Sequence, residues 1–373
     1  MGSWKMARFF GIDVKVHFTF ALALLLGAVS YGQQYDVHGY AFGVVVTLLM
    51  FACVLIHELS HSVVAQAFGI PVRQITIYPI GGVAQITKRP STPVQELLIA
   101  IAGPASNVVI AGGLFLAGTV LFGFHRPDHS AQQLLSRPTT ESLWWTLVVV
   151  NIGLAVFNMI PALPMDGGRV LRAALSMGAG TQKGTTWAAQ LGRLLALLMI
   201  GVGVFIPAWG LMLVGVFVYF GASAELAEAR RLQLLEGVRV IDALNPHVVR
   251  LSPDTPVQLV APTLAFSPQN AFEVRLGERL LGVATRAELI AAMRTGQPAF
   301  VAGVMRREYP TVSPNASLEE ARDRMNSALS PFVAVVQNGE CIGLITEHEL
   351  AAQAMMKEMA GEYQSRAEKR WDP

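Results

Sequence analysis

Long apolar stretches dominate the first 224 residues of the chain. Five of them are free of Lys, Arg, Asp and Glu or nearly so, and they come close to or exceed the roughly 20 residues that a membrane-spanning helix needs. They cover residues 18–35, 37–56, 97–124, 142–165 and 194–224. The last is too long for one crossing, and Pro207 and Gly210 near its middle predict a hairpin of helices at about 185–205 and 208–229. The pattern predicts a polytopic α-helical membrane protein with about six transmembrane helices.

The remaining residues carry frequent charges and contain an internal repeat with an offset of 61 residues. The run 251–254 (Leu-Ser-Pro-Asp) recurs at 312–315 (Val-Ser-Pro-Asn), and 282–285 (Gly-Val-Ala-Thr) recurs at 343–346 (Gly-Leu-Ile-Thr). Each copy predicts a turn, a helix, two short apolar strands and a second helix. We therefore expect a membrane domain at 1–235, an α/β module at 236–356 with halves at about 238–297 and 299–356, and a polar tail at 357–373.

The overall composition agrees with this division. Hydrophobic residues make up 53% of the chain and charged residues 14%, whereas soluble domains carry about 25% charge. A net charge of +2 is too small to indicate nucleic acid as a partner. The two cysteines, Cys53 and Cys341, lie far apart in different regions, so the sequence offers neither a disulfide framework nor a CxxC metal site.

Basic residues predict the orientation in the membrane, because they are enriched in cytoplasmic loops. They precede the first span, then lie between spans two and three, between spans four and five, and after span six. The opposite loops hold few of them. We expect both termini and the C-terminal module to be cytoplasmic. The residues on the predicted cytoplasmic side are Lys5, Arg8, Lys15, Arg73, Lys88, Arg89, Arg169, Arg172, Lys183, Arg230 and Arg231.

A metal-binding pattern lies at the predicted cytoplasmic end of the second span. His57-Glu58-Leu59-Ser60-His61 fits H-E-x-x-H, in which two histidines four residues apart share one helix face and the glutamate acts on a metal-bound water. The pattern follows an apolar helix, where ionisable groups are costly and usually functional. The alternative is that the motif lies just past the membrane edge, solvated and without a role.

Two histidines do not complete a catalytic zinc site, which usually has three protein ligands. Asp166 is the candidate for the third, since span four breaks at Pro161 and Pro164 and leaves Asp166 at the same predicted depth and side as His57. We expect these prolines and the following glycine pair to unwind the helix. Asp166 could alternatively cap the next helix, and Cys53, one turn before His57, is a weaker candidate ligand.

These motifs resemble the site-2 proteases, zinc metalloproteases that cut substrate helices inside the membrane, and in particular the prokaryotic members with CBS domains. The resemblance covers nearly the whole chain. It rests on residues 10–17 before the first span, the H-E-x-x-H pattern, Gly81-Gly82-Val83, Gly103-Pro104 with Asn107, and the run Asn158 to Gly168.

The resemblance implies that His57, His61 and Asp166 bind one Zn²⁺ and that Glu58 is the general base. It also implies that the segment around Gly81 and Gly82 is a membrane-associated hairpin that pairs with an extended substrate. Asn158, from the broken part of span four, could donate to the oxyanion or to the substrate backbone; the alternative is an interhelical hydrogen bond. The expected partners are transmembrane proteins such as anti-sigma factors or signal-peptide remnants.

The soluble half resembles a CBS pair, a module that often binds adenine nucleotides between its halves. The candidate nucleotide-binding residues are Thr285, Glu288, Thr346 and Glu349. In nucleotide-binding members the acid that contacts ribose is usually Asp, and here both positions hold Glu. The module could instead serve only as a platform for docking or for homodimer formation.

Two other functions compete with a protease. CBS pairs also occur on ion channels and transporters, but such a protein needs a polar path across the whole membrane, and the ionisable cluster here lies at one depth. The chain could also be an inactive protease homologue that acts as a binding partner, although a scaffold would not require Glu58.

Overall fold

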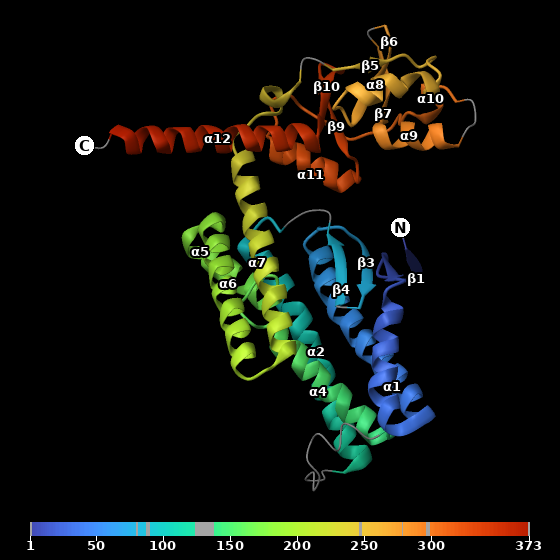
Figure 1. Cartoon of the computed structure of the whole chain (residues 1–373), viewed down its shortest axis with the longest axis vertical. Helices are drawn as coiled ribbons and strands as arrows, with labels where there is room; N and C mark the ends of the chain where they lie inside the picture. The colour runs from blue at the N-terminus through green and yellow to red at the C-terminus, as the bar shows by residue number, and fades with distance from the viewer. Residues whose placement is uncertain are drawn as a thin grey trace. The chain divides into compact units, whose positions relative to one another are not determined.

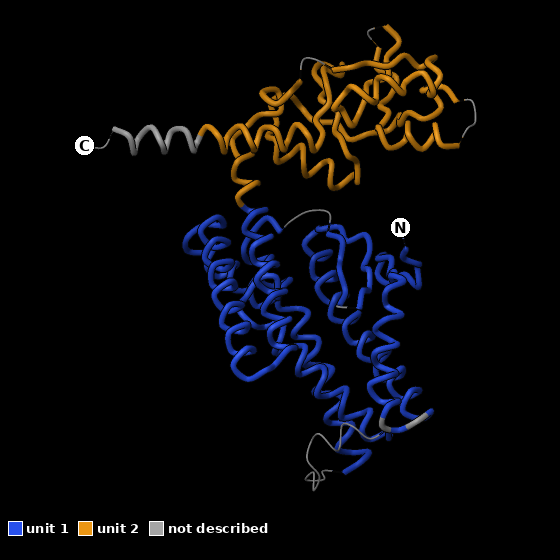
Figure 2. Tube along the Cα trace, viewed as in Figure 1, with its two compact units in different colours: residues 1–229 blue, residues 230–373 orange. Residues whose placement is uncertain are grey.

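The computed structural model describes residues 2–79, 81–86, 90–123, 138–245, 248–277, 279–295 and 299–371. The chain divides into two compact units, residues 1–229 and residues 230–373 (Figure 2). The first unit is mainly helical and holds the apolar stretches, and the second is an α/β unit (Figure 1).

Helix α1 (Phe20–Ala67) is folded back on itself as a helical hairpin. Its first arm, Phe20–Gln33, and its second arm, Val37–Ala67, lie side by side. A Cβ atom added to Gly43 would come 2.1 Å from the carbonyl oxygen of Gly27, so the two backbones touch there. Small residues permit this close approach between membrane helices. The hairpin agrees with the prediction of two spans before residue 67.

The other long apolar helices of the first unit are α2 (Pro93–Phe122), α4 (Thr140–Asn158), α6 (Thr181–Phe205) and α7 (Trp209–Leu235). Together with the second arm of α1, five helices in the described part of the chain are long and apolar enough to cross a membrane. The first arm is shorter than these five. The α6–α7 turn lies at Pro207, as the sequence predicted, while six as the number of spans stays a prediction.

A four-stranded sheet covers one end of α1. Its strands are β1 (Ser3–Phe9), β2 (Ile12–His17), β3 (Val72–Tyr78) and β4 (Gly81–Ile86), in that spatial order. β2 pairs in parallel with β3, and the other pairs are antiparallel. Ile12 and Ile75 of the sheet are buried in one cluster with Phe51 and Ala65 of α1. The β3–β4 hairpin was predicted, but β1 and β2 were not.

The second unit contains the two halves of the sequence repeat. β5 (Arg250–Leu251), β6 (Ala271–Leu276) and β7 (Arg279–Thr285) form one sheet, and β8 (Thr311–Val312), β9 (Phe332–Gln337) and β10 (Glu340–Thr346) form the other. In both sheets the first strand is parallel to the second and the second antiparallel to the third. The shared topology confirms the repeat.

Short helices complete each half of the second unit. The first half contains η2 (Val257–Val260), α8 (Ala261–Phe266) and α9 (Arg286–Arg294), and α10 (Val301–Val304) follows. The second half contains α11 (Leu318–Ala328) and α12 (Glu347–Trp371), and η1 (Val240–Ala243) lies at the start of the first half, before β5. The compact units meet at 229/230, within α7, whereas the domain limits expected from the sequence fall at its end, so those limits stay a prediction.

Candidate metal centre

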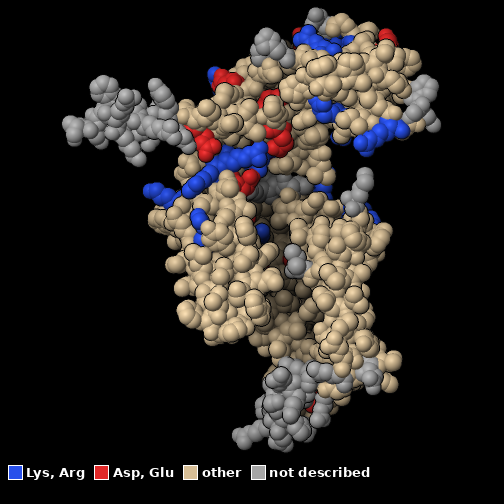
Figure 3. Space-filling model, viewed as in Figure 1, with Lys and Arg blue, Asp and Glu red and all other residues tan. Residues whose placement is uncertain are grey.

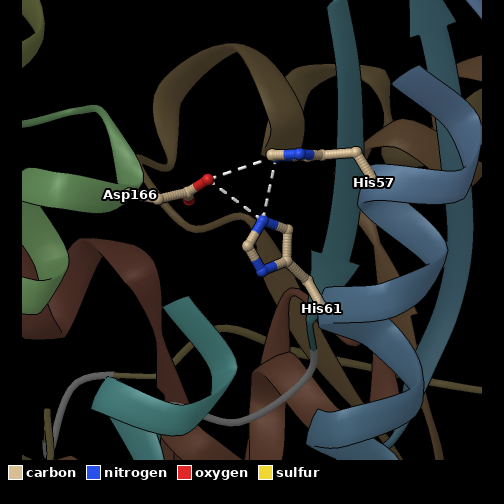
Figure 4. Close-up of side chains that lie close together, drawn as sticks. All are labelled: His57, His61 and Asp166. Carbon is tan, nitrogen blue, oxygen red and sulfur yellow. Dashed lines mark hydrogen bonds and ion pairs between the residues drawn. The ribbon is translucent and has the colours of Figure 1, made fainter. Parts of the chain in front are cut away.

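Three buried side chains converge in the first unit, two from the second arm of α1 and one from α5 (Asp166–Ala179) (Figure 4). The Nε2 atoms of His57 and His61 lie 3.1 Å apart, and each lies 3.1 Å from Oδ2 of Asp166. Tetrahedral zinc with ligand bonds of about 2.0–2.1 Å keeps its ligand atoms about 3.3 Å from one another. The three atoms are therefore spaced much like three of the four ligand atoms in a tetrahedral zinc site.

The other nitrogen of each imidazole is held by a hydrogen-bond acceptor. Nδ1 of His57 lies 2.5 Å from Oδ1 of Asn107, and Nδ1 of His61 lies 2.6 Å from the carbonyl oxygen of Ile99. Each Nδ1 therefore carries the proton and donates it, which leaves each neutral Nε2 with a bare lone pair. Two lone pairs and a carboxylate oxygen at 3.1 Å repel one another unless a cation lies between them. This donor set fits Zn²⁺, whose histidine ligands are usually oriented in this way.

Asp166 is positioned by the turn between α4 and α5. α4 ends at Asn158, the turn contains Pro161 and Pro164, and Asp166 is the first residue of α5. The residue before it, Met165, is the N-cap, and no side chain caps this helix. Asp166 is therefore not used as a helix cap, and its carboxylate is directed at the histidines instead.

The helix unwinds at the prolines as expected, but the glycine pair after Asp166 does not contribute to the break, and that part of the expectation was wrong. Gly167 and Gly168 form the first turn of α5. A Cβ atom on Gly167 would lie 2.3 Å from the carbonyl oxygen of Met159, and one on Gly168 would lie 2.3 Å from the backbone nitrogen of Leu163. Glycine is needed here because α5 packs directly against the preceding turn, which fixes the position of the carboxylate.

Helix α2 forms the wall behind the two histidines. A Cβ atom on Gly103 would lie 2.2 Å from Nε2 of His61 and 2.7 Å from Cε1 of His57, so only glycine leaves room for the rings. One turn further, Nδ2 of Asn107 donates to Oδ1 of Asn151 on α4 over 2.8 Å. This bond fixes the amide so that its oxygen faces His57. α2 thus both clears space for the histidines and orients one of them.

The chain of buried polar groups ends at Cys53. Nδ2 of Asn151 donates to the sulfur of Cys53 over 3.2 Å and to the carbonyl oxygen of Leu147 over 2.8 Å. The thiol lies outside the group formed by the two histidines and Asp166. In the structure Cys53 is therefore an acceptor for the amide that supports Asn107.

Glu58 lies next to His57 on α1 and contacts the edge of the sheet. A Cβ atom on Gly82 of β4 would lie 2.5 Å from Cγ of Glu58, so the glutamate packs on the strand backbone at this glycine. Gly81 opens the strand with φ of +140°, a conformation that favours glycine. The two predicted glycines thus lie at the end of β4 that faces Glu58.

The space-filling view shows that the first unit is hollowed between the side formed by α5, α6 and α7 and the side formed by α1 and β4 (Figure 3). On this face, charged atoms are rare away from the end of the unit where α5 lies. Asn158, the last residue of α4, is half-buried, and its side chain makes no hydrogen bond to any residue that the structure describes. The structure does not bring Asn158 into the ligand group itself.

The four predicted nucleotide-binding residues form two equivalent helix caps in the second unit. The backbone N–H and the hydroxyl of Thr285 both donate to Oε2 of Glu288, over 3.0 and 2.6 Å, and Thr346 makes the same two bonds to Glu349. Glu288 also pairs with Arg306 at 2.5 Å. Although partial burial opposes the shift, the bonds from Thr285 and Arg306 hold the pKa of Glu288 below its usual range.

The sequence interpretation missed the hydrogen-bond partners of the ligands. Asn107 entered only as part of a resemblance, and Asn151 and the Ile99 carbonyl did not enter at all. Asn151 is an amide within a mainly apolar span, where polar side chains often hydrogen-bond to a neighbouring helix, and this signal could have identified it. A backbone carbonyl such as that of Ile99 leaves no signal in the sequence.

Comparison with known proteins identifies the family. The model of peptidase family M50 matches residues 45–199, which include both histidines and Asp166, and the CBS domain model matches residues 301–355. A zinc metalloprotease of Methanocaldococcus jannaschii is 31% identical over 365 residues, covering 96% of this chain and 98% of the relative. A predicted zinc metalloprotease of Synechocystis is 30% identical, covering 91% of this chain and 92% of the relative.

A solved structure of a site-2 protease from Methanocaldococcus jannaschii is 36% identical, with a TM-score of 0.44, and covers 60% of this chain and 95% of that one. The two relatives match along almost their entire lengths, through both units. The chain therefore belongs to peptidase family M50, the membrane-embedded site-2 proteases, and is a zinc metalloprotease with a C-terminal CBS domain.

Proposed function

We propose that this zinc metalloprotease is an intramembrane endopeptidase that hydrolyses peptide bonds within the membrane-spanning segments of other proteins. The observation that carries the proposal is the convergence of the two Nε2 atoms and Oδ2 of Asp166 at 3.1 Å. Two of the three ligands stand on a helix apolar enough to span a membrane. Membrane-tethered regulators such as anti-sigma factors, and signal-peptide remnants, are substrates of the right kind.

In this proposal His57, His61 and Asp166 hold the zinc ion. When bound there, zinc would act as a Lewis acid that makes water a stronger nucleophile and polarises the scissile carbonyl. Glu58 accepts the proton at its carboxylate and passes it to the leaving amine. Asn107 and the Ile99 carbonyl keep both imidazoles in the tautomer that leaves Nε2 free. Asn158, whose amide makes no hydrogen bond within the described residues, is available to donate to the substrate.

We further propose that the substrate binds as an extended strand along β4. In the described sheet β4 pairs only with β3, so its other edge carries backbone groups ready for strand addition. A substrate helix must unwind before its backbone can be attacked, and its freed polar groups need partners inside an apolar environment. Glu58 packs against Gly82 of this strand, so a segment paired there would run past the proposed base.

The variant Glu58→Gln tests the activity. It should abolish cleavage of a membrane-helix substrate by the purified, full-length protein, because a neutral amide cannot accept the proton. Zinc content should stay at the wild-type level, since Glu58 is not a ligand in this assignment. Cleavage at the wild-type rate by this variant would refute both the assignment and the mechanism, and it also separates an active protease from an inactive homologue.

For the second unit we propose a regulatory role with an adenine nucleotide as effector, held near Thr285, Glu288, Thr346 and Glu349. The symmetrical placement of these residues in the two halves supports paired sites. The hydrogen bonds between Thr and Glu in each half argue against nucleotide binding, because a ribose would have to displace them. Cleavage rates measured with and without ATP decide the matter: an unchanged rate and KM would leave the unit as a docking or homodimer platform.

Our proposal for orientation keeps both termini on the cytoplasmic side of a prokaryotic plasma membrane. The basic residues Arg169, Arg172 and Lys183 support it, since they lie together on α5 and at the start of α6. Cysteines introduced at Thr181 and at Ala208 should react from opposite sides of the membrane, the first from the cytoplasm. Labelling of both from one side would contradict this topology.

A further inference from the structure

Arg169 is a cation beside the metal centre that the proposed mechanism does not use. It follows Asp166 by three residues on α5, so the two side chains leave the same face of the helix. Its Nε atom is fully buried and has no hydrogen-bond partner. Within the described part of the chain, Arg169 takes part in no hydrogen bond or ion pair of its side chain.

The next arginine on α5, Arg172, shows how a guanidinium with a structural role is paired in this fold. Arg172 donates to Oε1 of Glu96 over 2.6 Å and to Oε2 of Glu225 over 2.9 Å, so carboxylates from α2 and α7 hold it. Buried N–H groups are almost always bonded in native proteins, and an exception indicates a missing partner such as a ligand. A guanidinium stays protonated in proteins, so it cannot avoid the cost of an unpaired N–H group by losing the proton. Arg169 therefore stands without the structural partners that Arg172 has.

Arg169 lies near the groups that would act on a substrate. Asp166, one turn before Arg169 on the same face of α5, lies 3.1 Å from His57, the residue next to Glu58, and no ion pair joins Arg169 to Glu58. Glu58 in turn packs against Gly82 on β4. Arg169 and the proposed base thus both lie beside the ligand group, Glu58 directly after His57 and Arg169 one turn after Asp166, and Glu58 contacts the open strand. Because Glu58 does not bind the guanidinium, the buried Nε–H of Arg169 stays available as a donor.

We propose that Arg169 is a substrate-positioning residue that donates to a backbone carbonyl oxygen of the extended substrate segment lying along β4. This inference rests on the proposed intramembrane protease function. An unwound segment of a membrane helix carries carbonyl groups that have lost their intrahelical partners, and in an apolar environment each needs a donor. A peptide carbonyl is neutral, so it binds the guanidinium without an opposing charge near Glu58. β4 satisfies one edge of the substrate strand, and Arg169 satisfies an acceptor on its other side.

Steady-state kinetics of the full-length protein with a synthetic membrane-helix substrate test the inference. Arg169→Gln should lower kcat/KM by about 10- to 100-fold, mainly through a higher KM, because a charge-assisted bond made in both the ground and transition states is lost. Arg169→Lys should lose less, since it keeps one charged donor. Lys183→Gln, which removes an exposed positive charge at the start of α6, is the matched control and should behave as wild type.

A substrate with a backbone ester near the scissile bond provides a second measurement, because an ester carbonyl is a weaker acceptor than an amide. If Arg169 binds that carbonyl, the ester should cost the wild type more than it costs Arg169→Gln. Unchanged KM and kcat in Arg169→Gln would overturn the inference, and so would loss of zinc from that variant, which would show a structural role. The proposed function fails separately, if the wild type does not cleave or if Glu58→Gln cleaves as well as wild type.

Discussion

Gly103 decides how much space the histidine ligands have. In the variant Gly103→Ala the added Cβ atom would lie 2.2 Å from Nε2 of His61, which is too close for two non-bonded atoms. Neither histidine ring can move away without losing the spacing of ligand atoms that fits zinc. We expect zinc affinity to fall by at least about 10-fold, as outer-shell changes around zinc commonly do. The measurement is zinc content by mass spectrometry after dialysis against a chelator.

Gly112 on the same helix is the matched control, since a Cβ atom added there meets nothing within 4 Å. Gly112→Ala should keep wild-type zinc content. Equal zinc retention in Gly103→Ala and Gly112→Ala would mean that α2 does not confine the histidines as the structure indicates.

Asn107 determines the tautomer of His57. Asn107→Leu removes the acceptor of the Nδ1 proton, so the ring can place its proton on Nε2 and turn away from the metal. Zinc affinity should fall by about 10- to 100-fold. Asn107→Asp keeps an acceptor at the same place and should retain most of the binding, so a chelator titration that ranked Asp below Leu would contradict this role.

At the residue scale, the sequence predicts the metal ligands better than the residues that hydrogen-bond to them. His57 and His61 follow from a helical period, and Asp166 follows from the depth at which span four breaks. The bond between Asn107 and Asn151 depends on how α2 and α4 are rotated about their axes, which apolar periodicity does not determine in spans that are hydrophobic all around. For the same reason Arg169 enters the sequence interpretation only as a basic loop residue.

The elements themselves show where sequence patterns fail. β1 and β2 were missed although Ile12, Val14 and Val16 alternate with Asp13, Lys15 and His17, which is the period of a strand. The segment is short and lies before a long apolar stretch, so the membrane signal dominated the interpretation. The α6–α7 hairpin was found because a proline marks its turn.

The two arms of α1 are held together by backbone contact at a pair of glycines. Gly43→Leu should force the arms apart, because even a Cβ atom would lie 2.1 Å from the Gly27 carbonyl oxygen. Overpacking of this kind costs about 1–3 kcal/mol of unfolding free energy. Thermal unfolding in detergent measures it.

Gly113→Leu on α2 is the control, since a Cβ atom at this exposed position meets nothing within 4 Å. Its melting temperature should match that of the wild type. If Gly43→Leu had the same melting temperature as Gly113→Leu, the close approach of the two arms would not contribute to the stability of the protein.

For the molecule as a whole, a cluster of three half-buried charges links helices that are distant in sequence. Arg172 of α5 joins Glu96 of α2 to Glu225 of α7, and all three side chains are less than a third exposed. Arg172→Met leaves two half-buried carboxylates without a partner, which should destabilise the first unit by about 1–3 kcal/mol. Denaturation of the detergent-solubilised protein measures the loss.

Replacing both acids as well, with Glu96→Gln and Glu225→Gln, should restore most of the stability lost in Arg172→Met, because no uncompensated charge remains. If the triple variant were no more stable than Arg172→Met, the loss would come from packing and not from charge. The sequence alone does not predict that these three residues pair, because each lies on a different helix.

Helix α7 has a further consequence for how the protein is made. Its last residue, Leu235, is buried in the second unit with Val312, Leu318 and Leu350, all from the second half of the repeat. During synthesis this helix end leaves the ribosome more than a hundred residues before its packing partners are complete. The apolar end of α7 must therefore wait uncovered while the first half of the repeat folds. In a nascent chain stalled before Leu350 that end would stay exposed, so unfinished copies of the enzyme should be cut by proteases at this helix end more readily than the complete chain.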